Sequence, residues 1–209
     1  MKFSRARITP VLATLGLGAI IGVLGALVGK LDTPMFHAVS LVFSAGWSWA
    51  LLGFLAGYFR RTKAGAALLS SSALAIGVTV YYLLKALSPA APIGLDVTLE
   101  SNVESAWPRI FAWGVLAFVL GAPMGLFGNL ARISGLSGLP FRLSVPVIAY
   151  VETSWRLDVE AAAAGPGAEA TWSATRVLAV LAVIALVGHT VWGWRTRHSG
   201  PKVRVDSPD

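Results

Sequence analysis

Between Thr9 and Leu31 the chain reads TPVLATLGLGAIIGVLGALVGKL, in which Lys30, close to the end, is the only charged side chain. A helix needs about 20 mostly apolar residues to cross the hydrocarbon core of a bilayer, so this run predicts a transmembrane helix. The fifth of six such runs is the weakest, because Pro146 lies early in it and charged residues interrupt its second half. The sequence therefore predicts an all-α, polytopic membrane bundle of six transmembrane helices. The other five runs cover residues 38–59, 64–87, 110–131, 143 to between 155 and 164, and 174–194.

The composition agrees with a membrane protein and excludes several other classes. Of the 209 residues, 56% are hydrophobic and 13% are charged, whereas a soluble domain has about 25% charged residues. The mean hydropathy is +0.70, and such an apolar chain is not intrinsically disordered. The chain has no cysteine, which excludes a disulfide scaffold, a zinc site with thiolate ligands and a thiol enzyme.

The basic residues predict how the six helices are oriented. Twelve of the 17 Lys and Arg residues fall in the two ends of the chain and in the second and fourth loops. Because Lys and Arg collect on the cytoplasmic side, we predict a multi-pass protein of the cell membrane with both termini cytoplasmic. This orientation explains the net charge of +7, so nucleic acid is not expected as a partner. Residues 1–194 are expected to form one domain, and residues 195–209 a polar, disordered cytoplasmic tail.

Glu152 is the one acidic residue that falls within a predicted span, in the segment IAYVETSW of residues 148–155. Burial among apolar and aromatic neighbours disfavours the charged form of a carboxyl group, so a protonated Glu152 could act as an acid. The alternative is a salt bridge with Arg156, which lies four residues further along the same helix face. His189, the other ionisable residue of a span, is expected to pack against a neighbouring helix.

The eight tryptophans are a second unusual feature. Those near the ends of spans, Trp172 among them, fit the aromatic belt at the membrane interface. Other aromatic residues fall where spans would meet, and their ring faces could form a pocket that stabilises a cation. The same residues could instead pack together or bind a lipid. The candidate pocket residues are Trp47, Trp49, Tyr81, Tyr82, Trp113 and Tyr150.

Small residues and missing motifs narrow the function further. Glycines three or four residues apart, such as Gly18 and Gly22, allow helices to approach closely. The segment GAPMGLFG of residues 121–128 is predicted to kink its helix at Pro123, and such a kink can open a cavity. The sequence has no acidic diphosphate-binding cluster, no phosphate-binding lysine loop and no zinc-binding HExxH. We therefore expect neither a metal nor a cofactor.

Four segments carry a resemblance: SAGWSWALLGFLAG at residues 44–57, YY at 81–82, GAPMGLFGNLAR at 121–132 and AYVE at 149–152. They resemble small multi-pass membrane proteins of actinobacteria, in particular the membrane-bound cyclases of indole sesquiterpenoid pathways in Streptomyces, the drimentine type. The resemblance implies a terpene cyclase that protonates an alkene of a farnesyl indole and guides carbocation cyclisation without loss of diphosphate. It implies that Glu152 is the proton donor and that the apolar, prenylated substrate enters from the lipid bilayer. The alternative is a non-enzymatic membrane protein, such as a transporter subunit, an accessory protein or a lipid-binding protein.

Overall fold

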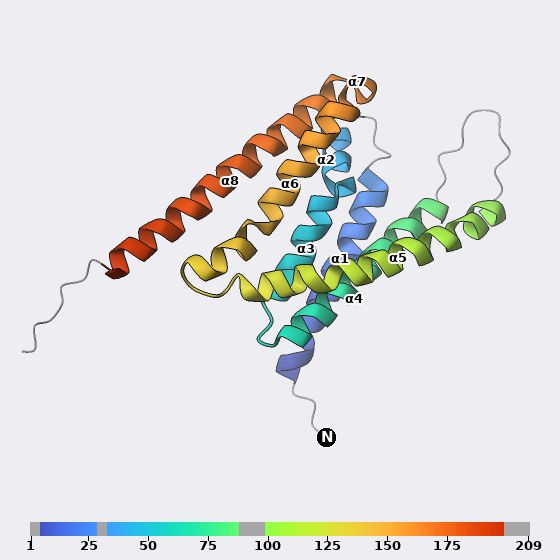
Figure 1. Ribbon diagram of the computed structural model, residues 1–209. Helices are drawn as coiled ribbons and strands as arrows, with labels where there is room; N and C mark the ends of the chain where they lie inside the picture. Colours follow the sequence, from blue (N-terminus) through green and yellow to red (C-terminus); the bar gives the residue numbers. More distant parts are fainter. Residues whose placement is uncertain (1–4, 29–32, 88–98, 199–209) are drawn as a thin grey trace, which may run out of the picture.

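The computed structural model describes residues 5–28, 33–87 and 99–198, and over these residues the chain is all-helical (Figure 1), as predicted. Three long helices, α4 (Lys63–Leu87), α5 (Leu99–Leu130) and α8 (Pro166–His198), make up much of the molecule. The other elements are α1 (Arg5–Val28), α2 (Pro34–Ser44), α3 (Gly46–Tyr58), the 3₁₀ turn η1 (Leu136–Gly138), α6 (Leu139–Val159) and α7 (Ala161–Ala164).

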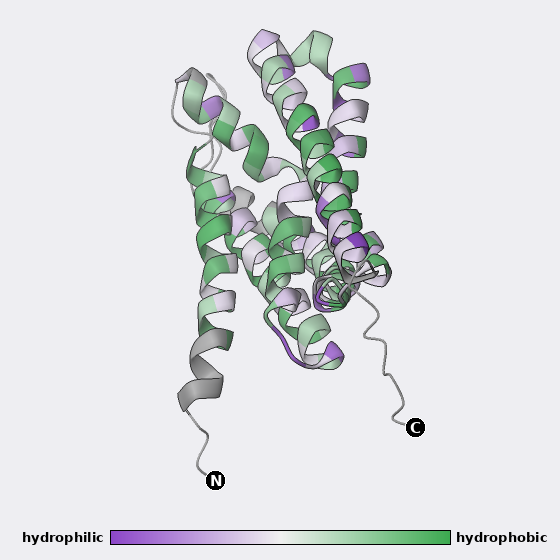
Figure 2. Ribbon diagram, turned by 90° about the vertical axis from the view of Figure 1, so that its left-hand side faces the viewer, coloured by the Kyte–Doolittle hydropathy of each residue, from purple (hydrophilic) through white to green (hydrophobic). Residues whose placement is uncertain are grey.

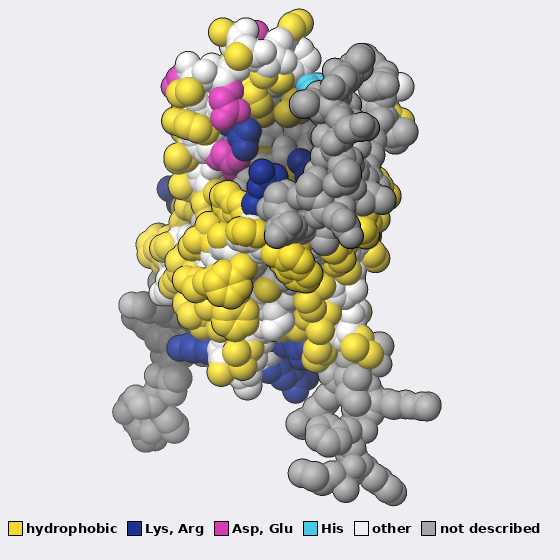
Figure 3. Space-filling view, turned by 90° about the vertical axis from the view of Figure 1, so that its right-hand side faces the viewer, with side chains coloured by type: hydrophobic (Ala, Val, Ile, Leu, Met, Phe, Trp, Pro, Cys, Tyr) yellow, Lys and Arg dark blue, Asp and Glu magenta, His cyan; other side chains and the backbone are white. Residues whose placement is uncertain are grey.

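Several of these helices have the properties of membrane spans. The helices α1, α4, α5 and α8 are long and apolar enough to cross a membrane, and the bent pair α2 and α3 is a fifth candidate if counted as one span. On the face shown in Figure 3, apolar side chains form a band between Lys and Arg at one end and side chains of both charges at the other. The start of α1 and the end of α8 lie at the same end of the bundle (Figure 2). The helix α6 is not among the candidates, and it contains Arg142, Glu152, Arg156 and Asp158.

The second apolar run does not form the single helix that the sequence predicts over residues 38–59. That prediction is wrong, because α2 and α3 are separated at Ala45 and their axes differ by 61°. Ala45 has an extended backbone (φ −75°, ψ 140°) and provides no side-chain cap for α3. The first two amide groups of α3 instead donate hydrogen bonds to a carboxylate of α6. The break therefore depends on a contact between segments that are distant in the sequence.

Three smaller expectations are also wrong. Trp172 is only 3% exposed and packs inside the protein, with the Arg156 guanidinium of α6 at 5.8 Å from the centre of its ring. His189 is exposed on α8, while its neighbour Thr190 is the buried residue that faces α6. The polar tail is helical as far as His198, because α8 continues beyond its apolar part. Residues 29–31 of the first run and residues 199–209 of the tail lie outside the described residues.

Glycines bring α1 and α4 into close contact. A Cβ atom at Gly18 would meet the backbone carbonyl of Ala73, and one at Gly22 would meet that of Gly77. Gly77 in turn leaves room for the ring of Trp49, since a Cβ atom there would lie 2.8 Å from it. The spacing of small residues thus sets how α1, α3 and α4 pack.

We expect Gly22→Val to lower the free energy of unfolding by about 1–3 kcal/mol, because the new side chain would overlap the α4 backbone. The matched control is Gly16→Val on the same helix, where a Cβ atom would have nothing within 4 Å. Unfolding of the two variants in detergent, followed by tryptophan fluorescence, measures the difference. An equal loss of stability in both would contradict close packing at Gly22.

Candidate functional site

A cavity of about 550 Å³ lies where α3, α4 and α5 meet, and its wall is completed by the end of α2 and by Ile148 of α6. Most of the side chains around it are aliphatic or aromatic. Ligand pockets in proteins have volumes of about 300–1,000 Å³ and mostly apolar walls. The cavity is therefore of the size and polarity that suit an apolar organic molecule.

Aromatic rings from two helices form one wall of the cavity. Trp49 of α3 and Tyr81 of α4 contact each other edge to face, with ring centres 6.5 Å apart and planes at 80°. Tyr81 and Tyr82 contact each other in the same way, at 5.1 Å and 88°. The indole N–H of Trp49 donates a hydrogen bond of 2.9 Å to the carbonyl of Phe43 in α2. These contacts hold the rings in one arrangement.

The wall that α5 contributes is itself exposed. Trp113, Leu116 and Leu120 line the cavity, and their exposed fractions are 50%, 42% and 52%. The cavity is therefore open along α5. This exposed side belongs to α5, which is long and apolar enough to cross a membrane.

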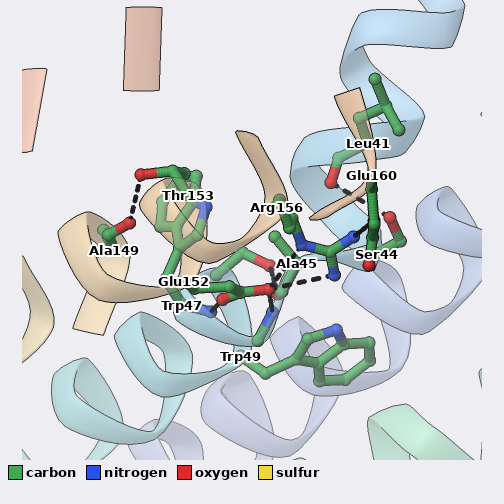
Figure 4. A network of polar contacts seen from close by, with 12 residues as sticks. Leu41, Ser44, Ala45, Trp47, Trp49, Ala149, Glu152, Thr153, Arg156 and Glu160 are labelled. Carbon is green, nitrogen blue, oxygen red and sulfur yellow. Dashed lines mark hydrogen bonds and ion pairs between the residues drawn. The ribbon is translucent and has the colours of Figure 1, made fainter. Parts of the chain in front are cut away.

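The carboxylate of Glu152 joins α6 to the first turn of α3 (Figure 4). Its Oε1 accepts a hydrogen bond from the Gly46 amide and its Oε2 one from the Trp47 amide, each of 2.8 Å. Arg156 donates to Oε1 through Nε and Nη2, both at 3.1 Å. A second ion pair of 3.1 Å joins Nη1 of Arg156 to Glu160, one turn further along α6. The chain of three side chains is called the α6 ion-pair chain below.

These contacts fix the position of the Glu152 carboxyl group. Its side chain is 18% exposed, and it faces a guanidinium group together with two amides at the positive end of a helix dipole. The structure thus contains the salt bridge with Arg156 that was one of the two sequence interpretations. The carboxylate also replaces the missing local cap of α3, which the sequence gave no reason to expect.

Gly46 separates Glu152 from the cavity. Gly46 lines the cavity and Glu152 does not. A Cβ atom at Gly46 would lie 3.2 Å from Oε2 of Glu152, so the absence of a side chain allows the carboxylate to reach the start of α3. The carboxyl group is therefore directly behind the cavity wall, with one backbone unit between them.

The structure places four of the six aromatic residues predicted for a pocket in the cavity wall and two outside it. Trp49, Tyr81, Tyr82 and Trp113 line the cavity, whereas Trp47 and Tyr150 do not. Trp47 contributes its backbone amide to Glu152, and Tyr150 is 45% exposed on α6. The sequence analysis did not predict the aliphatic walls of α4 and α5, although the kink expected at Pro123 indicated a cavity near this part of α5. The cavity residues that come from that segment are Pro123, Met124 and Phe127.

Neither a metal-binding cluster in the described part of the chain nor a known relative defines the site further. Among the described residues, no group of three or more His, Asp or Glu side chains could hold a metal ion. No protein-family model, no curated protein and no solved structure matches the chain. The resemblance to indole sesquiterpenoid cyclases therefore rests on the four quoted segments.

Proposed function

We propose that the chain is a membrane protein that takes an apolar molecule of isoprenoid type from the bilayer into the aromatic cavity. The observation that carries this proposal is the cavity itself, with a volume of about 550 Å³ and walls of aliphatic and aromatic side chains. Transfer from lipid gives little hydrophobic driving force, so close contact with the rings of Trp49 and Tyr81 would supply the affinity. A protein with this binding function needs no catalytic group, and we describe it as a lipid-binding protein.

We also propose that the cell membrane is crossed six times, with α6 as the remaining span and both chain ends cytoplasmic. The charged residues of α6 support this, because Arg156 is paired with Glu152 and with Glu160, and pairing lowers the free energy needed to bury charges. The shared position of the two chain-end helices (Figure 2) and the clustering of basic residues toward the predicted cytoplasmic loops agree with an even number of spans.

Filling the cavity tests the binding proposal. Ala117 of α5 lines the cavity, whereas Ala112 of the same helix is exposed and is not part of the lining. We expect Ala117→Phe to weaken the binding of farnesol at least about tenfold, because the ring would occupy the ligand's space, and Ala112→Phe to have little effect. The affinity can be measured with purified protein in detergent, from the change in fluorescence of the native tryptophans. Equal affinities in the two variants would refute a ligand in this cavity.

A second candidate function is acid-initiated terpene cyclisation. The observation that favours it is a carboxyl group immediately behind Gly46, in the wall of a cavity that aromatic rings also line. Glu152 would transfer its proton to a terminal alkene carbon of a farnesyl chain, and the cation at the other carbon would be attacked by the next alkene. Loss of a proton from the last cation would restore an alkene and return the proton to the protein. Because a proton is gained and lost, substrate and product would have the same mass.

The chemistry can be tested without knowing the product. Membranes that contain the protein are incubated with a farnesyl indole, and the extract is searched for an isomer of unchanged mass with fewer alkenes. Formation of such an isomer supports the cyclase, and binding without conversion supports the lipid-binding protein. Four hydrogen bonds from Gly46, Trp47 and Arg156 occupy the carboxyl oxygens of Glu152. Catalysis therefore requires that the pair with Arg156 opens before a substrate alkene can reach this group.

A further inference from the structure

The cavity has a basic rim at one end. Tyr81 of α4 and Trp113 of α5 line the cavity. Lys85 follows Tyr81 by one helical turn, and Arg109 precedes Trp113 by one turn, so each basic residue shares a helix face with a lining residue. The Nζ atom of Lys85 lies 4.9 Å from the centre of the Tyr81 ring. The pair of Lys85 and Arg109 is called the basic rim below.

The two members of the basic rim lie at the same level of the bundle. Ala86, next to Lys85, packs in one buried cluster with Ala106 and Ile110 of α5, and Ile110 is next to Arg109. Tyr82 packs against the same cluster, and its hydroxyl group is within electrostatic reach of Arg109. Aromatic rings of α4 and α5 thus line the cavity, and the two cations lie one helical turn beyond them on the same two helices, which pack together.

The charge of the basic rim is uncompensated in the part of the chain that the structure describes. Lys85 and Arg109 are both exposed, and neither has an ion pair with a residue whose side chain the structure describes, which on α5 means residues 106–130. Arg156 of α6 differs from them, because Glu152 and Glu160 already bind it. Lys85 and Arg109 are therefore the exposed cations beside the cavity that an additional anion could bind.

We propose that the ligand of the cavity is an amphiphile with an apolar chain and a phosphate-type anionic headgroup, which binds at the basic rim. This inference depends on the proposed function, because it assigns the headgroup of the molecule whose chain fills the cavity. A phosphate oxygen accepts charge-assisted hydrogen bonds from Lys and Arg, while the chain lies among the rings of Trp49 and Tyr81. The same chemistry occurs in a membrane phospholipid and in an isoprenoid phosphate.

The test compares two probes that share one chain. The full-length protein in detergent is titrated with farnesyl phosphate and with farnesol, and binding is followed by the fluorescence of the native tryptophans. We expect farnesyl phosphate to bind at least about tenfold more tightly, with an advantage that decreases as salt is added. The double variant Lys85→Gln, Arg109→Gln should lose this preference and keep its affinity for farnesol. The matched control Arg61→Gln removes an exposed cation from the loop between α3 and α4 and should keep the preference.

The outcomes separate the headgroup from the cavity. Equal affinity of the native protein for both probes, or an unchanged preference in the double variant, would overturn the basic rim as the headgroup site. Normal binding of both probes by Ala117→Phe would instead refute the cavity, whatever the rim does. With the preference established, displacement of farnesyl phosphate by phosphatidylglycerol supports a phospholipid as the source. Failure of phosphatidylglycerol to displace it supports an isoprenoid phosphate.

Discussion

Replacing Glu152 by alanine is expected to lower the free energy of unfolding by about 3–5 kcal/mol. The substitution leaves the guanidinium of Arg156 without one of its two carboxylates, and it leaves the amides of Gly46 and Trp47 without an acceptor at the start of α3. Both losses act in a site where the carboxylate is only 18% exposed, so water cannot fully replace the missing contacts. Unfolding in detergent, followed by tryptophan fluorescence, gives the change in free energy.

Glu160→Ala is the matched control for this prediction. Glu160 binds the same Arg156 at the same distance of 3.1 Å, but its side chain is 37% exposed and contacts no helix start. We expect a loss below about 1 kcal/mol, as for other exposed ion pairs. A double-mutant cycle with Arg156→Ala then isolates the coupling between Glu152 and Arg156. Similar losses for Glu152→Ala and Glu160→Ala would show that the contact with α3 contributes no stability.

The second large effect concerns catalysis and applies to the cyclase candidate. Glu152→Gln should form no cyclised product from a farnesyl indole, because the N–H group of an amide is far too weak an acid to protonate an alkene. Arg156→Gln should retain product formation or increase it. This variant removes the guanidinium that occupies Oε1 of Glu152, so the carboxyl group becomes more accessible to the substrate. Product is measured by mass spectrometry against the amount of folded protein in each membrane preparation.

The two variants exclude different explanations. Turnover by Glu152→Gln at the native rate would remove Glu152 as the acid. Loss of product in Arg156→Gln, with folded protein still present, would show that the charged pair itself is required. The variant Glu160→Gln, which changes a carboxylate one turn further from α3, should convert substrate at the native rate. If Glu160→Gln also loses activity, the loss in Glu152→Gln would be explained by damage to the α6 ion-pair chain and not by a missing proton donor.

The apolar runs allowed much of the helical architecture to be predicted, and the limits of that prediction have physical causes. The run of residues 64–87 corresponds almost residue for residue to α4, because length and hydropathy are local properties. The break at Ala45 could not be predicted in this way. It depends on a carboxylate 106 residues away in the sequence, which accepts the Gly46 amide. Nothing within residues 34–58 identifies that partner.

The candidate site could likewise be predicted where it depends on the local sequence, but not where it depends on contacts with a distant helix. Trp49, Tyr81 and Trp113 could be proposed for a pocket because aromatic residues stood out within the predicted spans. Trp47 and Trp49 are two residues apart and cannot share a helix face, and the structure assigns the cavity to Trp49. The burial of Trp172 was missed because its neighbours, such as Arg156, come from another helix. A position near the end of a span does not reveal such a neighbour.

The α6 ion-pair chain bears on how the protein is assembled during its synthesis. In the proposed six-span arrangement, α6 would enter the bilayer less readily on its own than α4 or α8, because it contains more charged residues. The ribosome makes α3 before α6, so the amides of Gly46 and Trp47, which bind Glu152, have already been synthesised when Glu152 leaves the ribosome. In that six-span arrangement, insertion of α6 would therefore be coupled to a preceding segment. A defect at the start of α3 would then impair the insertion of a helix made about a hundred residues later.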